Sequence, residues 1–507
     1  MPTIDGSSIK LDDIPRLTAA GRKDLRLDDS ARKAVEAARA TVEDILASGR
    51  VVYGINTGFG KLASTRIPAD KLATLQRNLI LSHAVGVGEP LSKEIARLAL
   101  ILRANNLACG HSGVRTVVVE RLLDLVNADV VPVIPSQGSV GASGDLAPLA
   151  HMTLVLLGEG EAWVGDERLP GAEALAAVGL EPLELEAKEG LALINGTQIS
   201  CAIGAVALSR ALELAEAAEV ACAMTLEALK GSVRPFDSRV GDLRPHPGHA
   251  RVSANIRALM AESEILASHA DCGRVQDQYS LRCVPQVHGA VRDALDHVRT
   301  VVEREMNSVT DNPLIFPADG DVISAGNFHA EPLAIPFDYA AAAVCELANI
   351  SERRLENMVN PDLSGLPPFL IESSGLNSGF MIAQVTAAAL VSENKCLAHP
   401  ASVDSVPTSA NKEDHVSMAP IAARKFGMIV ENTAHVLAIE LAGALQGLRL
   451  GNPERLRPGR GVAAAFDFLA ALVPPLTEDR ILQHDFAAVR RSLDDGRLLE
   501  TVRRSLA

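Results

Sequence analysis

The segment at 138–151 reads GSVGASGDLAPLAH, and its centre places Ala142, Ser143 and Gly144 just ahead of an apolar run. Three kinds of chemistry fit these residue types. The segment can be a plain loop in which Asp145 caps the helix that follows. Ser143 can be a nucleophile on a tight turn. Alternatively, the backbone itself can react.

The spacing of the glycines bears on this choice. A serine hydrolase elbow has the order Gly-x-Ser-x-Gly, whereas here the second glycine, Gly144, falls one place early. Because Gly144 has no Cβ, its amide nitrogen can approach a carbonyl two residues back more closely than that of any other residue. The segment alone leaves all three interpretations open.

Other polar side chains gather in short stretches elsewhere. Tyr53 begins YGINTGFG, which lacks the Gly-Lys-Ser/Thr of a phosphate-binding loop. His83 ends an apolar, helix-like run, where a histidine is by default a structural residue. The remaining candidates are Asn195 in INGTQ, the helically spaced Gln276, Tyr279 and Arg282, Phe328 in SAGNFHAEP and Glu413 in SANKEDH.

The histidines do not form a recognisable metal site. The thirteen histidines include no HExxH motif and no paired His/Cys cluster. His329 and Glu331 lie two apart and His415 follows two acids, but hydrogen-bonded structure explains both patterns. We therefore expect no metal.

The net charge, the cysteine content and the lengths of the apolar runs exclude several classes of protein. A net charge of −15 and a pI near 5.4 argue against nucleic acid and against anionic membranes as partners. Seven cysteines without a CxxC pair fit reduced thiols in the cytosol. The first residues lack a signal-peptide profile, and no run of eighteen residues is apolar without interruption. We expect a soluble, cytoplasmic protein with no membrane span.

Long stretches rich in Ala, Leu and Glu predict helices of about twenty residues that pack as a bundle. They lie at 205–230, 286–310, 339–359, 380–398 and 428–446. Strand-like segments are few and short, as at 51–53 and 130–134. The expected fold class is mainly α, with a loop-rich N-terminal part, residues 1–200, followed by a central helical bundle and C-terminal helices, residues 201–507.

In this order the short stretches resemble the motifs of one family. YGINTGFG, SHAVGVG, GSVGASGDLAPLAH, INGTQ, QDQYSLRCVPQVHGA, SAGNFHAEP and SVDSVPTSANKEDHVSM are similar to those of the aromatic amino acid ammonia-lyases and aminomutases. SHAVG, FHAEP and SANKEDHVSM resemble the histidine ammonia-lyase branch. The motifs run from about residue 51 to 418, so the resemblance covers essentially the whole chain.

The resemblance implies that the backbone at Ala142, Ser143 and Gly144 cyclises on itself. The Gly144 nitrogen attacks the Ala142 carbonyl and two waters are lost, one of them from the serine side chain. The product is a methylidene-imidazolone (MIO), an electrophile with a terminal CH₂, so no cofactor is added. A general base accelerates a reaction only about 10²–10⁴-fold, whereas enzymes commonly accelerate reactions by more than about 10⁶-fold. Covalent capture of the substrate amine supplies the missing part.

The resemblance also assigns roles around this electrophile. Tyr53 matches an acid–base residue, although a free phenol titrates near 10, and Asn195 matches a hydrogen-bond donor to the electrophile or the amine. Arg282 matches the arginine that binds the substrate carboxylate, and Gln276 and Tyr279 should face the same pocket.

The remaining matches concern the substrate ring. Phe328 matches a residue that packs against an aromatic ring, and His83 and Glu413 match residues that line the imidazole side. The base that removes the β-proton is Tyr53, Tyr279 or Glu413.

The expected function is therefore non-oxidative elimination of ammonia from L-histidine to trans-urocanate, the first step of histidine degradation. The family implies an ammonia-lyase/aspartase-like helical fold and a homotetramer with active sites built from more than one subunit. The nearest alternative is a tyrosine or phenylalanine ammonia-lyase or 2,3-aminomutase. A serine hydrolase using Ser143 and a catalytically silent helical scaffold are the alternatives from other classes.

Overall fold

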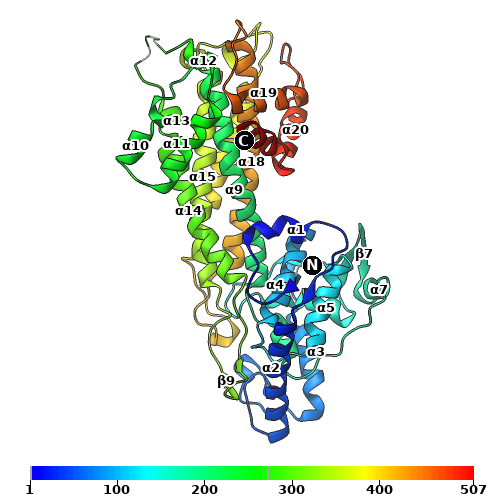
Figure 1. The fold of residues 1–507 in the computed structure, drawn as a ribbon. Helices are drawn as coiled ribbons and strands as arrows, with labels where there is room; N and C mark the ends of the chain where they lie inside the picture. Colours follow the sequence, from blue (N-terminus) through cyan, green and yellow to red (C-terminus); the bar gives the residue numbers. More distant parts are fainter. Residues whose placement is uncertain (1–2, 271–272, 274) are drawn as a thin grey trace. The chain divides into compact units, whose positions relative to one another are not determined.

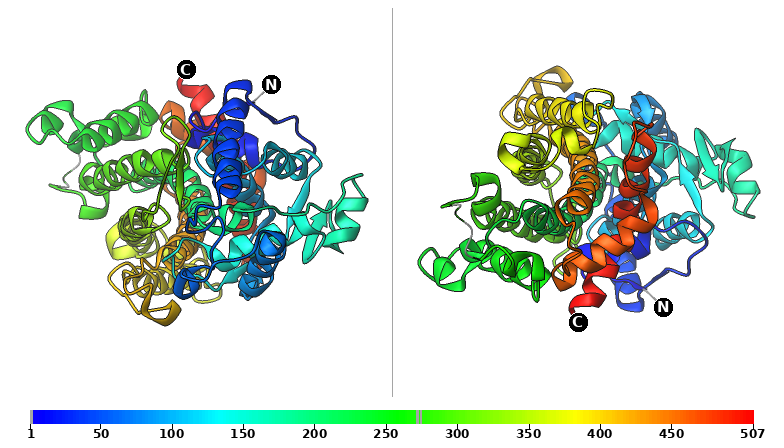
Figure 2. Two further views of the ribbon diagram at one scale, coloured as in Figure 1. Left: turned by 90° about the horizontal axis from the view of Figure 1, so that it is seen from below. Right: turned by 90° about the horizontal axis from the view of Figure 1, so that it is seen from above.

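The computed structural model describes residues 3–270, 273 and 275–507 and is mainly helical, which confirms the predicted fold class (Figure 1). Each predicted long helix is present. These helices are α9 (Gln198–Ala228), α14 (Val284–Glu305), α15 (Glu331–Val359), α17 (Met381–Leu397) and α18 (Ala419–Gly451), and they are seen end-on in Figure 2. α9, α15 and α18 are longer than their apolar runs predict.

The other helices are shorter. In chain order they are α1 (Ile14–Thr18), α2 (Asp29–Ser48), α3 (Leu72–His83), α4 (Lys93–Ala108), α5 (Thr116–Asn127), α6 (Leu146–Leu154), α7 (Gly171–Ala176), α8 (Glu189–Ile194), α10 (Ser238–Asp242), α11 (Pro247–Leu259), α12 (Glu264–Ala267), α13 (Tyr279–Arg282), α16 (Pro361–Ser364), α19 (Arg460–Leu472), α20 (Gln483–Asp494) and α21 (Arg497–Leu506). Two 3₁₀ turns near the site are η2 (Gly60–Leu62) and η7 (Ser409–Asn411).

The strands of the described residues form small sheets. The largest is antiparallel, in the order β4 (Val130–Pro132), β6 (Glu161–Val164) and β7 (Glu167–Pro170). The two-stranded pairs are β1 (Thr3–Ile4) with β2 (Arg26–Leu27), β3 (Val87–Pro90) with β5 (Pro135–Gln137), and β8 (Leu314–Phe316) with β9 (Asp321–Ile323). The strand predicted within 130–134 is therefore confirmed.

The strand predicted at 51–53 is wrong. Tyr53 lies in a turn, because the Val52 carbonyl accepts hydrogen bonds from the backbone of Ile55 and Asn56. The Val52 N–H also donates a hydrogen bond to Oδ1 of the Asn56 side chain, at 2.9 Å. These local bonds compete with strand pairing, so the β-branched residues do not form a ladder.

The chain folds into two compact units. Unit 1 contains Met1–Val206, Arg299–Asp338 and Pro400–Arg424, and unit 2 contains Ala207–Val298, Tyr339–His399 and Lys425–Ala507. The division expected after residue 200 follows chain order and stays a prediction. The structure adds that two later segments group with the N-terminal part.

Three short helices of unit 1 bring distant segments together. α3, α6 and α8 pack on one another, and α8 is buried along its whole length. His83 ends α3, the segment at 138–145 leads into α6, and Asn195 follows α8. Packing of these apolar helices therefore places three candidate site segments in one region.

By length and composition, α9, α15 and α18 are apolar enough to cross a membrane, although none contains eighteen apolar residues without interruption. Their most apolar windows are 78%, 67% and 78% buried inside the protein. A helix that is apolar around most of its circumference is expected in the core of a large helical protein as well as in a membrane. Burial within the protein accounts for this composition.

A buried ion pair links three helices within unit 2. Arg354 on α15 donates from Nε and Nη2 to Glu440 on α18, at 2.5 and 2.7 Å, and both side chains are fully buried. Thr225 on α9 and Ser351 on α15 also donate to Glu440. The carboxylate thus has donors from both α9 and α15, which offsets its loss of hydration.

Replacing Glu440 with alanine should therefore destabilise the protein by about 3–5 kcal/mol, because Arg354 would keep a buried, unpaired charge. The measurement is the free energy of unfolding in denaturant. Glu216→Gln is the control, because it breaks the exposed pair with Arg503 and should cost about 1 kcal/mol or less. Equal losses for the two variants would contradict this account.

Candidate active site

The segment at 138–145 has a backbone that only glycine adopts readily at three positions. Gly138, Gly141 and Gly144 have φ angles of +136°, +70° and +73°. Gly144 forms an isolated parallel bridge with Gly196, and a Cβ added at Gly144 would overlap the Gly196 carbonyl. The absence of a side chain therefore permits this approach of two backbones.

Neighbouring segments hold the same loop from the other side. The Gly141 carbonyl accepts from Ser417 Oγ at 3.0 Å and from the Ala330 N–H at 3.2 Å. The Ala142 side chain is buried against Val416 and Met418. The chain segments before α15 and before α18 therefore both contact the candidate electrophile.

Asp145 does not act as the predicted cap. It occupies the N-cap position of α6, but its carboxylate makes no capping hydrogen bond. Instead it accepts from the N–H and the hydroxyl of Ser200, both at 2.7 Å, while its own N–H donates to the Gly196 carbonyl. Complete burial raises the pKa of Asp145 to about 6, against the effect of the Ser200 hydrogen bonds. A tertiary contact replaces the local cap.

Ser143, Asn195 and Glu413 meet in one place. Ser143 Oγ donates to Glu413 Oε1 at 2.5 Å, and Asn195 Nδ2 donates to the Ser143 carbonyl at 2.8 Å. Thr408 Oγ1 donates to the other oxygen of Glu413, at 2.6 Å. The Ser143 hydroxyl is therefore bonded to a carboxylate, whereas a hydrolase serine is activated by a basic group such as histidine.

His83 lies close enough to Glu413 to feel its charge. Its Nδ1 lies 2.8 Å from the Leu79 carbonyl, so the proton belongs on Nδ1 and leaves Nε2 as an acceptor. Burial lowers the pKa of His83, while the Leu79 carbonyl and the charge of Glu413 act in the opposite direction. His83 is consequently a neutral imidazole at pH 7.

Tyr53 lies on a segment that reaches the region of Glu413, and Phe328 lies on a segment that contacts the loop at 138–145. The Tyr53 hydroxyl accepts from the Gly60 N–H at 3.5 Å, and η2, which begins at Gly60, lies against η7 just before Glu413. Phe328 is half-buried in the turn between β9 and α15. Its segment is tied to the loop through the bond from Ala330 to Gly141.

The other predicted residues, Gln276, Tyr279 and Arg282, belong to unit 2. Their spacing predicts one helix, but α13 begins only at Tyr279, and Gln276 precedes it in irregular structure. The prediction is wrong at Gln276, because the intervening Asp277 accepts a bond from the Ser232 N–H instead of continuing a helix. The Arg282 guanidinium lies 4.5 Å from the centre of the Tyr279 ring.

Sequence reasoning missed the polar residues that support the site. Arg103 on α4 is fully buried and donates to the Asn195 carbonyl at 3.0 Å and to Gln198 at 2.6 Å. Thr408, which donates to Glu413, could have been predicted from the sequence, because it lies in the same motif as Glu413, SVDSVPTSANKEDHVSM. Arg103 had none, because its partners are more than 90 residues away.

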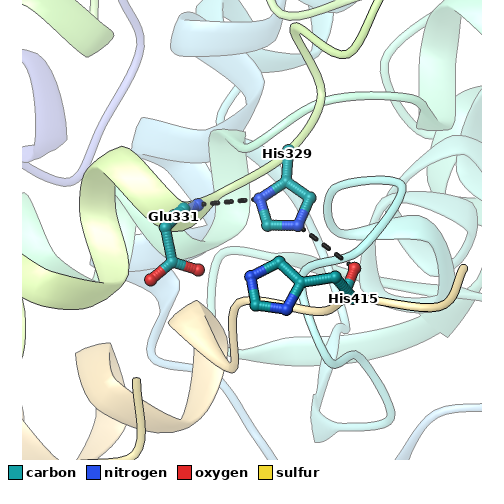
Figure 3. Close-up of side chains that lie close together, drawn as sticks. All are labelled: His329, Glu331 and His415. Carbon is teal, nitrogen blue, oxygen red and sulfur yellow. Dashed lines mark hydrogen bonds between the residues drawn. The ribbon is translucent and has the colours of Figure 1, made fainter. Parts of the chain in front are cut away.

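Figure 3 shows His329, Glu331 and His415, whose donor atoms lie within 4.8 Å of one another and are of types that could hold a metal ion. The two imidazole rings are stacked with 5.6 Å between centroids. His329 Nδ1 accepts from the Glu331 N–H, and its Nε2 lies 3.2 Å from the His415 carbonyl. Both ring nitrogens of His329 thus have backbone partners, and a metal would have to displace one.

We expect this cluster to retain no stoichiometric zinc, since binding would break one of those hydrogen bonds. The measurement is zinc content after dialysis of the purified protein at micromolar zinc, with His329→Ala as the comparison. Retention of one zinc ion per chain that His329→Ala abolishes would contradict the expectation.

The comparisons with known proteins agree with the motifs. A model of the aromatic amino acid lyase family matches residues 9–471. The histidine ammonia-lyase of Sorangium cellulosum is 54% identical, with 98% of each chain covered. That of Deinococcus radiodurans is 55% identical, over 94% of this chain and 90% of its own.

Solved structures give the same result. The histidine ammonia-lyase of Trypanosoma cruzi has a TM-score of 0.92 at 44% identity, covering 99% of this chain and 95% of that one. The tyrosine aminomutase of Streptomyces globisporus has a TM-score of 0.94 at 36% identity, covering 100% and 99%. The chain belongs to the aromatic amino acid lyase family, which confirms the resemblance seen in its sequence and the class of enzyme that it implies.

Proposed function

We propose that this chain is a histidine ammonia-lyase that converts L-histidine to trans-urocanate and ammonia. The observation that carries the proposal is the grouping of His83 and Glu413 beside Ser143. Both side chains can hydrogen-bond an imidazole nitrogen, for which a phenylalanine-selective pocket has no use. Full-length relatives at 49–55% identity that carry this name support the same assignment.

The residues at 142–144 fit the self-made MIO ring. Gly144 has its amide in a backbone where a Cβ has no room, and Ala142 presents a small side chain to a buried cluster. Ser143 contributes a hydroxyl that can be eliminated. Once formed, the ring supplies an electrophilic CH₂ that binds the substrate amine and makes nitrogen a better leaving group.

Side chains from more than one copy of this chain then bind and orient the substrate. Asn195 directs its amide at the Ser143 carbonyl, which belongs to the electrophile. His83, as a neutral imidazole, accepts one hydrogen bond from the substrate ring through Nε2, and Phe328 packs on that ring. Arg282 takes the carboxylate through two parallel hydrogen bonds. Tyr53, Tyr279 and Glu413 are the candidate bases for the β-proton.

We further propose a cytoplasmic homotetramer in which chains share active sites. Tyr279 is 71% exposed, and Arg282 Nε is buried without a hydrogen-bond partner among the described residues. An exposed phenol stacked on a guanidinium with an unused donor is expected of groups that another chain and the substrate complete. This supports a site composed of more than one subunit.

The direct test is an assay of the purified protein with L-histidine, L-tyrosine and L-phenylalanine, following the ultraviolet absorbance of each unsaturated product. We expect urocanate from histidine and no comparable rate with the others. Removing the ring hydrogen bond with His83→Leu should raise KM for histidine about tenfold or more. Turnover of tyrosine instead, or formation of a β-amino acid, would assign the chain to another branch of the family.

Gly144→Ala should prevent formation of the electrophile, because the added Cβ overlaps the Gly196 carbonyl. The intact mass of the wild-type protein should be two waters below that of its sequence, and the variant should keep both waters. Gly427→Ala is the matched control, since a Cβ there meets nothing within 4 Å. A Gly144→Ala protein that loses both waters would refute the geometric argument.

A further inference from the structure

Ser143 carries the hydroxyl group that must leave before the MIO ring is complete. Its Oγ lies 2.5 Å from Glu413 Oε1, a distance typical of a strong hydrogen bond involving a carboxyl group. Thr408 holds the other oxygen, so the orientation of Glu413 is fixed. The carboxyl group is therefore aimed at the one oxygen that has to leave the serine side chain.

Formation of the electrophile has two dehydrations with different requirements. In the first, the Gly144 nitrogen bonds to the Ala142 carbonyl carbon, and the Ala142 oxygen leaves as water with the hydrogens of the Gly144 and Ser143 nitrogens. In the second, Ser143 loses its Cα hydrogen and its hydroxyl, and a Cα=Cβ bond forms. Hydroxide is a poor leaving group, so the second step needs a proton at Oγ.

We propose that Glu413 relays the proton of this second dehydration: its carboxylate, which accepts the hydrogen bond from Ser143 Oγ, takes up the proton that Cα releases and delivers it to Oγ as the Cβ–Oγ bond breaks, and the oxygen leaves as water. The proton that leaves Cα is thus the one that Oγ receives, so no oxidant, reductant or other reactant is consumed. The inference rests on the proposed function, since it requires that the ring forms.

Asn195 assists the other half of the same elimination, the loss of the Cα proton. When the Cα hydrogen leaves as a proton, negative charge develops on the Ser143 carbonyl oxygen. Asn195 Nδ2 already donates to that oxygen at 2.8 Å, and the Arg103 guanidinium holds the Asn195 carbonyl. A positioned donor at the developing oxyanion and an acid at the leaving group are the two aids that an elimination needs.

This assignment gives Glu413 two successive tasks. Before maturation its Oε1 is occupied by the Ser143 hydroxyl. After the hydroxyl has left, the same oxygen is free to bind the substrate. A role in substrate binding alone predicts normal maturation without Glu413, whereas the structure assigns it a role in both.

The test follows the intact mass of freshly synthesised full-length protein over time, for the wild type, Glu413→Gln, Glu413→Asp and Asp414→Asn. Wild type and Asp414→Asn, an exposed neighbour on the same segment, should lose two waters. Glu413→Gln keeps the shape but lacks the acid, so it should stop one water short, or lose the second about 10²–10⁴-fold more slowly. Glu413→Asp should recover part of the rate.

The outcomes separate the two proposals. A wild-type protein that keeps both waters overturns the proposed function itself. A wild-type protein that matures together with a Glu413→Gln protein that matures equally fast overturns the role of Glu413 and leaves the proposed function intact. Circular dichroism of each variant shows whether it folds, and Thr408→Val gives a second measurement, expected as slower loss of the second water.

Discussion

The approach of the Gly144 backbone to the Gly196 backbone is the constraint on which the rest of the site depends. It exists because neither residue has a side chain, and it joins the segment before α6 to the segment before α9. Asp145 and Asn195 flank this contact, so their positions follow from it. The buried hydrogen bonds that Ser200 donates to Asp145 and that Arg103 donates to the Asn195 carbonyl then hold both segments in place.

The site combines rigid support with a reactive surface. Asp145 and Arg103 are fully buried, and both are hydrogen-bonded to the segment 195–200. The side chains proposed to bind substrate or to react, His83, Ser143 and Glu413, are only partly buried. Preorganised donors of this kind stabilise developing charge without rearrangement at the moment of reaction.

The sequence predicts the long helices well, because packing in a bundle requires only the apolar periodicity that residues such as those at 205–230 display. It fails where a tertiary or side-chain contact overrides a local signal. Asp145 binds Ser200 instead of capping α6, and Asn56 folds 51–53 into a turn. The family resemblance alone predicts that Ser143 groups with Glu413, which lies 270 residues later. No local sequence pattern predicts the contact between Arg103 and Asn195.

The most direct test of the self-made electrophile is labelling of the native protein with cyanide, a small nucleophile, followed by peptide mapping with tandem mass spectrometry. The account predicts one adduct, at residue 143, and stronger protection by trans-urocanate than by cinnamate. No adduct at residue 143, or equal protection by the two acids, would contradict an electrophile that faces an imidazole-selective pocket.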